Sequence, residues 1–94
     1  MGGFIVERYW PGVTEADVLA ASAALHRATG GALPSAATVG VAPPDGVRYL
    51  GGILVPGDEV VLFRFEAPDA GLVEALGVRA GVRCDRVVPA QFLD

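Results

Sequence analysis

Four charged residues fall inside two otherwise apolar segments of the chain, and they are the first candidates for chemistry. Glu7 and Arg8 follow an apolar run near the start, and Arg64 and Glu66 interrupt the most apolar segment of the sequence. A buried charge without a partner costs several kcal/mol, so such side chains either pair with one another or line a wet cavity. Side chains alternate along a strand, which puts Arg64 and Glu66 on the same face of theirs.

The same alternation places Glu7 and Tyr9 on one face of the first apolar segment. If the two segments are neighbouring strands in register, these side chains meet Arg64 and form a polar cluster within an apolar surface. Such a cluster is suited to a small polar or aromatic ligand, and a structural salt bridge near the strand ends is the competing interpretation. The candidate ligand-binding residues are Glu7, Tyr9, Tyr49 and Arg64.

His26 is the single histidine of the chain and lies at the edge of a predicted helix's apolar stripe. One interpretation makes it a transition-metal ligand or a proton carrier near neutral pH. The other makes it a packed helix residue, because no second metal ligand stands four residues further on. A metal site built on His26 therefore needs ligands from elsewhere in the chain or from a second subunit.

Cys84 stands beside Arg83, Asp85 and Arg86. Nearby guanidinium groups lower the pKa of a thiol and make it reactive, whereas a packed cysteine acts as a small apolar side chain. With one cysteine the chain cannot form an internal disulfide. The spacing of Asp85 and Arg86 fits a turn hydrogen bond followed by an interface ion pair.

The composition limits the kind of protein. The chain has 94 residues, of which 52% are hydrophobic and 19% are charged, and a net charge of −4. This length allows one domain with one core. A nucleic-acid partner is not expected because the basic residues are few and scattered. No apolar run is long enough to span a bilayer, and no signal peptide is visible, so the expected location is the cytoplasm.

Patterning and turn residues predict six elements in the order β-α-β-β-α-β. Thr14 and Asp17 form a capping box that starts one helix, and Asp69 caps a second helix that Gly81 ends. The residues between the first helix and the second strand, about 31–46, form a Pro- and Gly-rich insertion within a single domain, 1–94. The predicted strands span 3–9, 47–55 with a bulge at Gly51-Gly52, 60–66 and 84–88.

This order is the split βαβ arrangement of α+β ferredoxin-like domains, a four-stranded antiparallel sheet with both helices on one face. The central strands nevertheless carry apolar residues toward both faces, as in Val60-Val61-Leu62-Phe63. An antiparallel sheet with one wet face would alternate apolar and polar residues instead. We therefore expect a second copy to cover the other face, which gives a homodimeric α+β barrel.

Several short segments resemble a family of short bacterial ferredoxin-like proteins, formerly a domain of unknown function and now described through a nickel-binding actinobacterial member. The resemblance implies a dimeric ferredoxin-like fold and binding of a transition metal such as nickel. The chain has Arg64 and Leu76 where many relatives have a cysteine and a histidine. The matching segments are Val6-Glu7-Arg8 with Pro11-Gly12, Val47-Arg48-Tyr49-Leu50, Phe65-Glu66-Ala67-Pro68-Asp69, Arg79-Ala80-Gly81 and Asp85-Arg86-Val87.

Two functions follow as hypotheses. The first is a homodimer that binds a metal ion or a small molecule in the cavity between two sheets. The second is a cofactor-free cyclase or oxygenase acting on an aromatic or polyketide-like substrate, by analogy with dimeric α+β barrels. In that case Arg64 stabilises an enolate or carbonyl oxygen, and Glu7 or His26 moves a proton. The insertion is long enough to cap the mouth of such a cavity.

Overall fold

The computed structural model describes residues 2–29 and 46–93, and these form a two-layer α+β fold. The predicted ferredoxin-like order is confirmed. The predicted insertion at about 31–46 lies outside the described residues except for its last residue. The elements are β1 (Gly2–Tyr9), α1 (Glu15–Ala28), β2 (Arg48–Val55), β3 (Val60–Ala67), α2 (Ala70–Ala80) and β4 (Arg86–Ala90).

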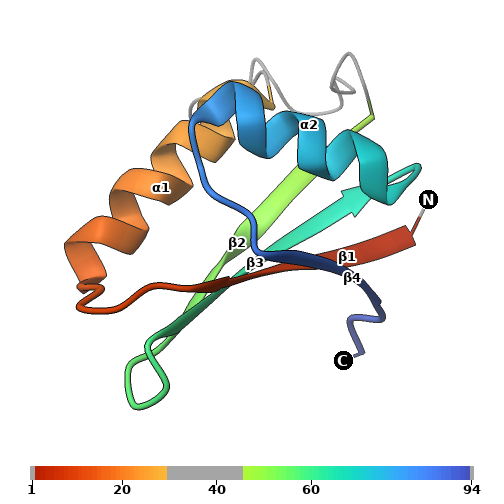
Figure 1. Cartoon of the computed structure of the whole chain (residues 1–94). Helices are drawn as coiled ribbons and strands as arrows, with labels where there is room; N and C mark the ends of the chain where they lie inside the picture. The colour runs from red at the N-terminus through yellow and green to blue at the C-terminus, as the bar shows by residue number, and fades with distance from the viewer. Residues whose placement is uncertain (1, 30–45, 94) are drawn as a thin grey trace.

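The four strands form one antiparallel sheet in the order β2-β3-β1-β4. The strands β1 and β3 are central neighbours, as predicted. Both helices lie on the same side of the sheet, and no helix of the described chain lies on the other side (Figure 1). We call the side that carries α1 and α2 the helix face and the opposite side the open face.

Local capping signals fix the ends of the helices. The backbone N–H of Asp17 donates to Thr14 Oγ1 over 3.2 Å, and the Asp17 carboxylate accepts from the Thr14 N–H over 3.0 Å. Asp69 accepts from the N–H of Leu72 at the start of α2. Gly81 ends that helix with φ of 71°, a left-handed conformation that glycine adopts without strain.

The core lies between the helices and the helix face. Alternate residues of β3, Val61, Phe63 and Phe65, are at most 1% exposed. They pack with fully buried side chains from both helices, among them Leu25 and Leu76. Full burial of each such side chain contributes about 1.5–3 kcal/mol, so this half of the molecule supplies most of the folding free energy.

The last strand runs two residues later than predicted, from Arg86 to Ala90 rather than from 84 to 88. Cys84 precedes the strand because its thiol packs against α2, where Gly77 leaves room for it. The strand continues through Pro89 because β4 is at the edge of the sheet, where a missing N–H is tolerated. In the described parts of the chain, neither helix has the length and apolarity needed to cross a membrane.

Candidate functional site

The open face carries apolar side chains that neither helix covers. The side chains of β3 that point away from the helices have register partners on β1 and β2 whose side chains also point away from the helices. None of their large apolar side chains is fully buried, and Ile53 and Tyr9 are 42% and 57% exposed. The apolar residues of this face are Ile5, Tyr9, Ile53, Val55, Val60, Leu62 and Val88.

The charged residues of the open face balance one another except at one position. Arg86 Nε lies 3.6 Å from a carboxylate oxygen of Glu7 on the adjacent strand. Arg48 lies opposite Glu66 in the register of β2 and β3, where opposite charges favour each other. Arg64 has Ile5 as its register partner on β1 and Gly51 on β2, so both of its direct partners are uncharged.

The Arg64 guanidinium lies across β2 and is held there by backbone. Its Nη2 donates to the carbonyl oxygen of Leu50 over 2.9 Å. A Cβ atom on Gly51 would lie 2.9 Å from the same nitrogen, so a side chain at this position would displace the guanidinium. Gly51 also has φ of 120°, at the register irregularity that follows Tyr49. The irregularity lies between Tyr49 and Gly51, just before the predicted bulge at Gly51-Gly52, and it brings the Leu50 carbonyl oxygen to Arg64.

Three of the predicted ligand-binding residues share the open face. Glu7 pairs with Leu62 in the register, Tyr9 pairs with Val60, and Arg64 is the next outward residue of β3. The alternation of side chains along the strands predicted that these three residues lie on one face, and the register confirms it. Whether they bind a ligand stays a prediction.

The predicted placement of Tyr49 beside these three residues is wrong. Tyr49 lies on the helix face, 7% exposed, and its hydroxyl hydrogen-bonds with Ser22 Oγ of α1 over 2.7 Å. Burial raises the pKa of Tyr49, against the smaller lowering effects of the Ser22 hydrogen bond and of Arg64. The bulge explains the error, because one extra residue in β2 shifts the alternation and turns Tyr49 to the other face.

His26 also lies on the helix side of the sheet, half-buried on α1. Its ring meets the Tyr49 ring edge-on, with centroids 4.8 Å apart. The sheet thus separates His26 from Glu7 and Arg64, and one subunit does not assemble the three proposed catalytic residues. Within residues 2–29 and 46–93, no three His, Cys, Asp or Glu side chains gather in a way that could hold a metal ion.

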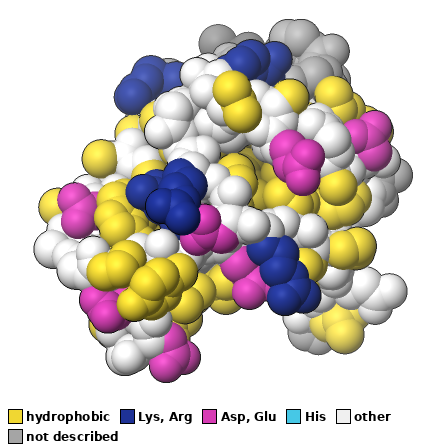
Figure 2. Space-filling model, in the orientation of Figure 1, with side chains coloured by type: hydrophobic (Ala, Val, Ile, Leu, Met, Phe, Trp, Pro, Cys, Tyr) yellow, Lys and Arg dark blue, Asp and Glu magenta, His cyan; other side chains and the backbone are white. Residues whose placement is uncertain are grey.

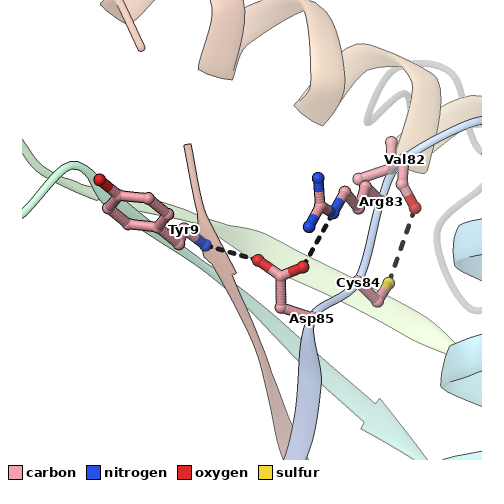
Figure 3. Close-up of polar contacts among 5 residues, drawn as sticks. All are labelled: Tyr9, Val82, Arg83, Cys84 and Asp85. Carbon is pink, nitrogen blue, oxygen red and sulfur yellow. Dashed lines mark hydrogen bonds and ion pairs between the residues drawn. The ribbon is translucent and has the colours of Figure 1, made fainter. Parts of the chain in front are cut away.

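Asp85 joins the start of β4 to the end of β1 (Figure 3). Its carboxylate accepts from the backbone N–H of Tyr9 and from Arg83 Nε, each over 2.8 Å. The backbone hydrogen bond from Tyr9, together with Arg83, holds the pKa of Asp85 below its usual value. The partner of the predicted turn hydrogen bond is therefore 76 residues away in sequence, and no local pattern could have found it.

Cys84 lies beside Asp85 and lines a hollow of about 470 Å³ between α2 and the segment that leads to β4. Burial raises the pKa of the thiol, and Glu74 and Asp85 add to this effect, while Arg8 opposes it. The thiol donates weakly to the carbonyl oxygen of Val82 over 3.7 Å (Figure 3). These contacts agree with the interpretation of Cys84 as a packed apolar side chain.

The segment after β4 and the distribution of charged side chains complete the description of the surface. The chain after β4 turns below the sheet (Figure 1), and the Phe92 ring lies 2.9 Å from where a Cβ on Gly3 would be. Figure 2 shows acidic and basic side chains interspersed over the visible face, with no basic cluster among the described residues there.

The described residues define a ferredoxin-like α+β protein with no helix on one face of its sheet. No protein-family model matches the chain, and no curated protein sequence matches it significantly. Among solved structures, the chain is similar to the crystal structure of SCO4226 from Streptomyces coelicolor A3(2), with a TM-score of 0.67 and 19% sequence identity. The alignment covers 98% of this chain and 99% of that one, so the fold of the whole chain has a counterpart of the same size.

Proposed function

We propose that the protein is a homodimer that binds a small organic molecule between two apposed sheets. One observation carries the proposal: β3 presents apolar side chains to both faces, while the helices bury those of one face alone. Val61 and Phe63 are 0% exposed, whereas Leu62 between them stays partly exposed on the open face. Exposed apolar patches of this kind mark binding surfaces in soluble proteins.

A second copy of the chain is the occupant that fits this face. Three strands of eight residues and one of five, about 4.8 Å apart, give the face a planar footprint of roughly 500 Å². Burying this footprint on both subunits would give roughly 1,000 Å² in total, at the low end of the range for specific interfaces.

The charges of the open face also suit a symmetric pairing. In a twofold dimer the same patch meets itself, so the patch must carry both members of each complementary pair. Glu7 and Glu66 supply negative charge at two places on the face, and Arg48 and Arg86 supply positive charge beside them. A partner of a different kind would need no such internal balance.

The ligand would lie where polar side chains interrupt the apolar surface. Glu7, Tyr9 and Arg64 are the polar residues that β1 and β3 bring together on this face, and the contact of Glu7 with Arg86, at 3.6 Å, is longer than a hydrogen bond. A few polar groups in an apolar enclosure are typical of small-molecule sites.

The nickel binding implied by the family resemblance does not fit the donors of one subunit. The ring of His26 packs on Tyr49, and the next polar neighbour of that tyrosine is the hydroxyl of Ser22. A transition metal prefers nitrogen, sulfur or carboxylate ligands in groups of three or more. The described residues offer no such group, so we derive no metal chemistry for this chain.

Native mass spectrometry of protein purified without a histidine tag tests the proposal. We expect a dimer that carries additional mass from a retained organic molecule, or that takes up a small molecule stoichiometrically. A retained nickel ion, lost in the His26→Ala variant, would instead support the metal-binding hypothesis. A monomer at micromolar concentration would refute the proposed dimer.

A further inference from the structure

Among the described residues, Arg64 is the charged residue of the open face whose direct register partners are all uncharged. Three arginines and two glutamates lie on this face, and each glutamate has an arginine beside or opposite it on the next strand. Among the described residues, no carboxylate oxygen forms an ion pair with Arg64. The centre of the face therefore carries a net positive charge in a protein whose total charge is −4.

One hydrogen bond holds the Arg64 guanidinium in place, and most of its N–H groups have no hydrogen-bond acceptor in the described chain. One of its five N–H groups donates to the Leu50 carbonyl oxygen. Its Nε is buried and hydrogen-bonds to nothing in the described chain. A guanidinium held by one backbone contact is preorganised, so little entropy is lost when an acceptor binds its remaining nitrogens.

The surroundings of Arg64 are apolar. Ile5 lies opposite it on β1, and Leu62 is the next residue of β3 on the same face. Ile53, which pairs with Leu62 on the other side, is 42% exposed. A charge-assisted hydrogen bond in such surroundings is stronger than one in water once a second sheet excludes solvent.

From these observations we propose that the site takes an apolar carboxylate, whose carboxyl group binds the terminal nitrogens of Arg64 and whose apolar body lies over Ile5, Leu62 and Ile53. The inference rests on the proposed dimer, which encloses the face. The competing occupant of Arg64 is a carboxylate of the partner subunit, and this possibility is an outcome of the experiment below.

The experiment compares two probes of the same shape, 2-naphthoate and its uncharged amide, 2-naphthamide, by isothermal titration calorimetry. Hydrogen bonds to a charged group contribute enough that we expect the naphthoate to bind at least about tenfold more tightly. In the Arg64→Gln variant this preference disappears, while the affinity for the amide stays the same. The control Arg27→Gln removes the same charge from an exposed residue of α1, on the other side of the sheet, and changes neither affinity by more than about twofold.

Sedimentation of the same samples separates the possible failures. An Arg64→Gln dimer that has lost the preference supports the proposal. Equal affinities of the wild type for both probes, or an unchanged preference in Arg64→Gln, overturn it. Dissociation of the Arg64→Gln dimer, with no binding of naphthoate by the wild type, assigns Arg64 to the partner's carboxylate and also overturns it. A monomeric wild type refutes the proposed dimer. In that case the ratio of the naphthoate and naphthamide affinities still shows whether Arg64 binds a carboxylate.

Discussion

Both faces of the single sheet carry apolar residues, but they differ in charge and in what covers them. On the helix face the inward residues of β3 are 0–1% exposed, and the described residues include no fully buried polar or charged residue. On the open face the apolar residues remain partly exposed, and five charged residues lie among them. The helix face is thus built for folding, and the open face is suited to association, which tolerates charges at its rim.

Two arginines on the central strands show the same contrast. Arg8 lies on the helix face, and its guanidinium carbon is 3.6 Å from the centre of the Trp10 ring, a cation–π contact within the subunit. Arg64 lies on the open face and has one backbone acceptor. Both arginines have a buried Nε without a hydrogen-bond partner in the described chain, but a ring of the same subunit covers Arg8, and no aromatic ring among the described residues covers Arg64.

Neighbouring substitutions in β3 test the difference between the faces most strongly. Phe63→Ala should lower the free energy of unfolding by about 3–5 kcal/mol at any protein concentration, because it leaves a cavity in the core. Leu62→Ala should cost less, and its cost should depend on protein concentration, because the partner subunit of the proposed dimer would bury this residue. Urea denaturation at several concentrations measures both. Equal losses that do not depend on concentration would contradict the distinction between the faces.

A charge on the open face should dissociate the dimer without unfolding the subunit. Leu62→Asp buries a carboxylate from each subunit in the interface, so we expect self-association to weaken at least a hundredfold, about 2.7 kcal/mol. The far-UV circular dichroism spectrum should stay the same. The control Leu19→Asp adds the same charge at a residue of α1 that is 61% exposed, and it should leave the sedimentation behaviour unchanged. Dissociation by both variants would remove the argument for the open face.

On the helix side, the contact between α2 and the segment before β4 predicts a smaller effect. A Cβ at position 77 would lie 2.6 Å from Cys84 Sγ, so Gly77→Ala should cost about 1–2 kcal/mol despite the higher helix propensity of alanine. Part of this loss should disappear in the Cys84→Ala background, which removes the sulfur. A double-mutant cycle from urea denaturation measures the coupling. If the two substitutions change the free energy of unfolding additively, the side chains at positions 77 and 84 do not clash.

The smallest predicted effect concerns the dependence of stability on pH. Because the fold lowers the pKa of Asp85, its contribution is fully present above the pKa of the unfolded state, about 3.9, and is lost as the pH falls through the lower folded-state pKa. Asp85→Asn keeps an acceptor for the Tyr9 N–H but cannot ionise, so its stability should change less between pH 5 and pH 2. Asp58→Asn, in an exposed turn, is the control and should follow the wild type.

Local signals in the sequence predicted most of the fold. The capping box at Thr14, the cap at Asp69 and the left-handed Gly81 each depend on a few adjacent residues, and all are present in the structure. The central position of β1 and β3 followed from the ferredoxin-like order. The open face followed from apolar residues on both sides of β3.

The errors arose where a contact depends on residues far apart in sequence. The side chain of Tyr49 points to the helices because the bulge before Gly51 changes the alternation of β2, and a glycine pair does not show which residue is the extra one. The predicted start of β4 was wrong because the Cys84 side chain packs against α2, where Gly77 has no side chain to exclude it. The acceptor for Arg64 is a backbone carbonyl on another strand, which has no signature in the sequence.

The most direct test of the central claim is an isotope-filtered NMR experiment on dimers mixed from labelled and unlabelled chains. It detects contacts between the methyl groups of one subunit and the protons of its partner. We predict contacts from Ile5, Leu62 and Val88 of the open face and none from Val61 of the helix face. Absence of intersubunit contacts from the open face, or contacts that arise from α1 and α2 instead, would contradict the account.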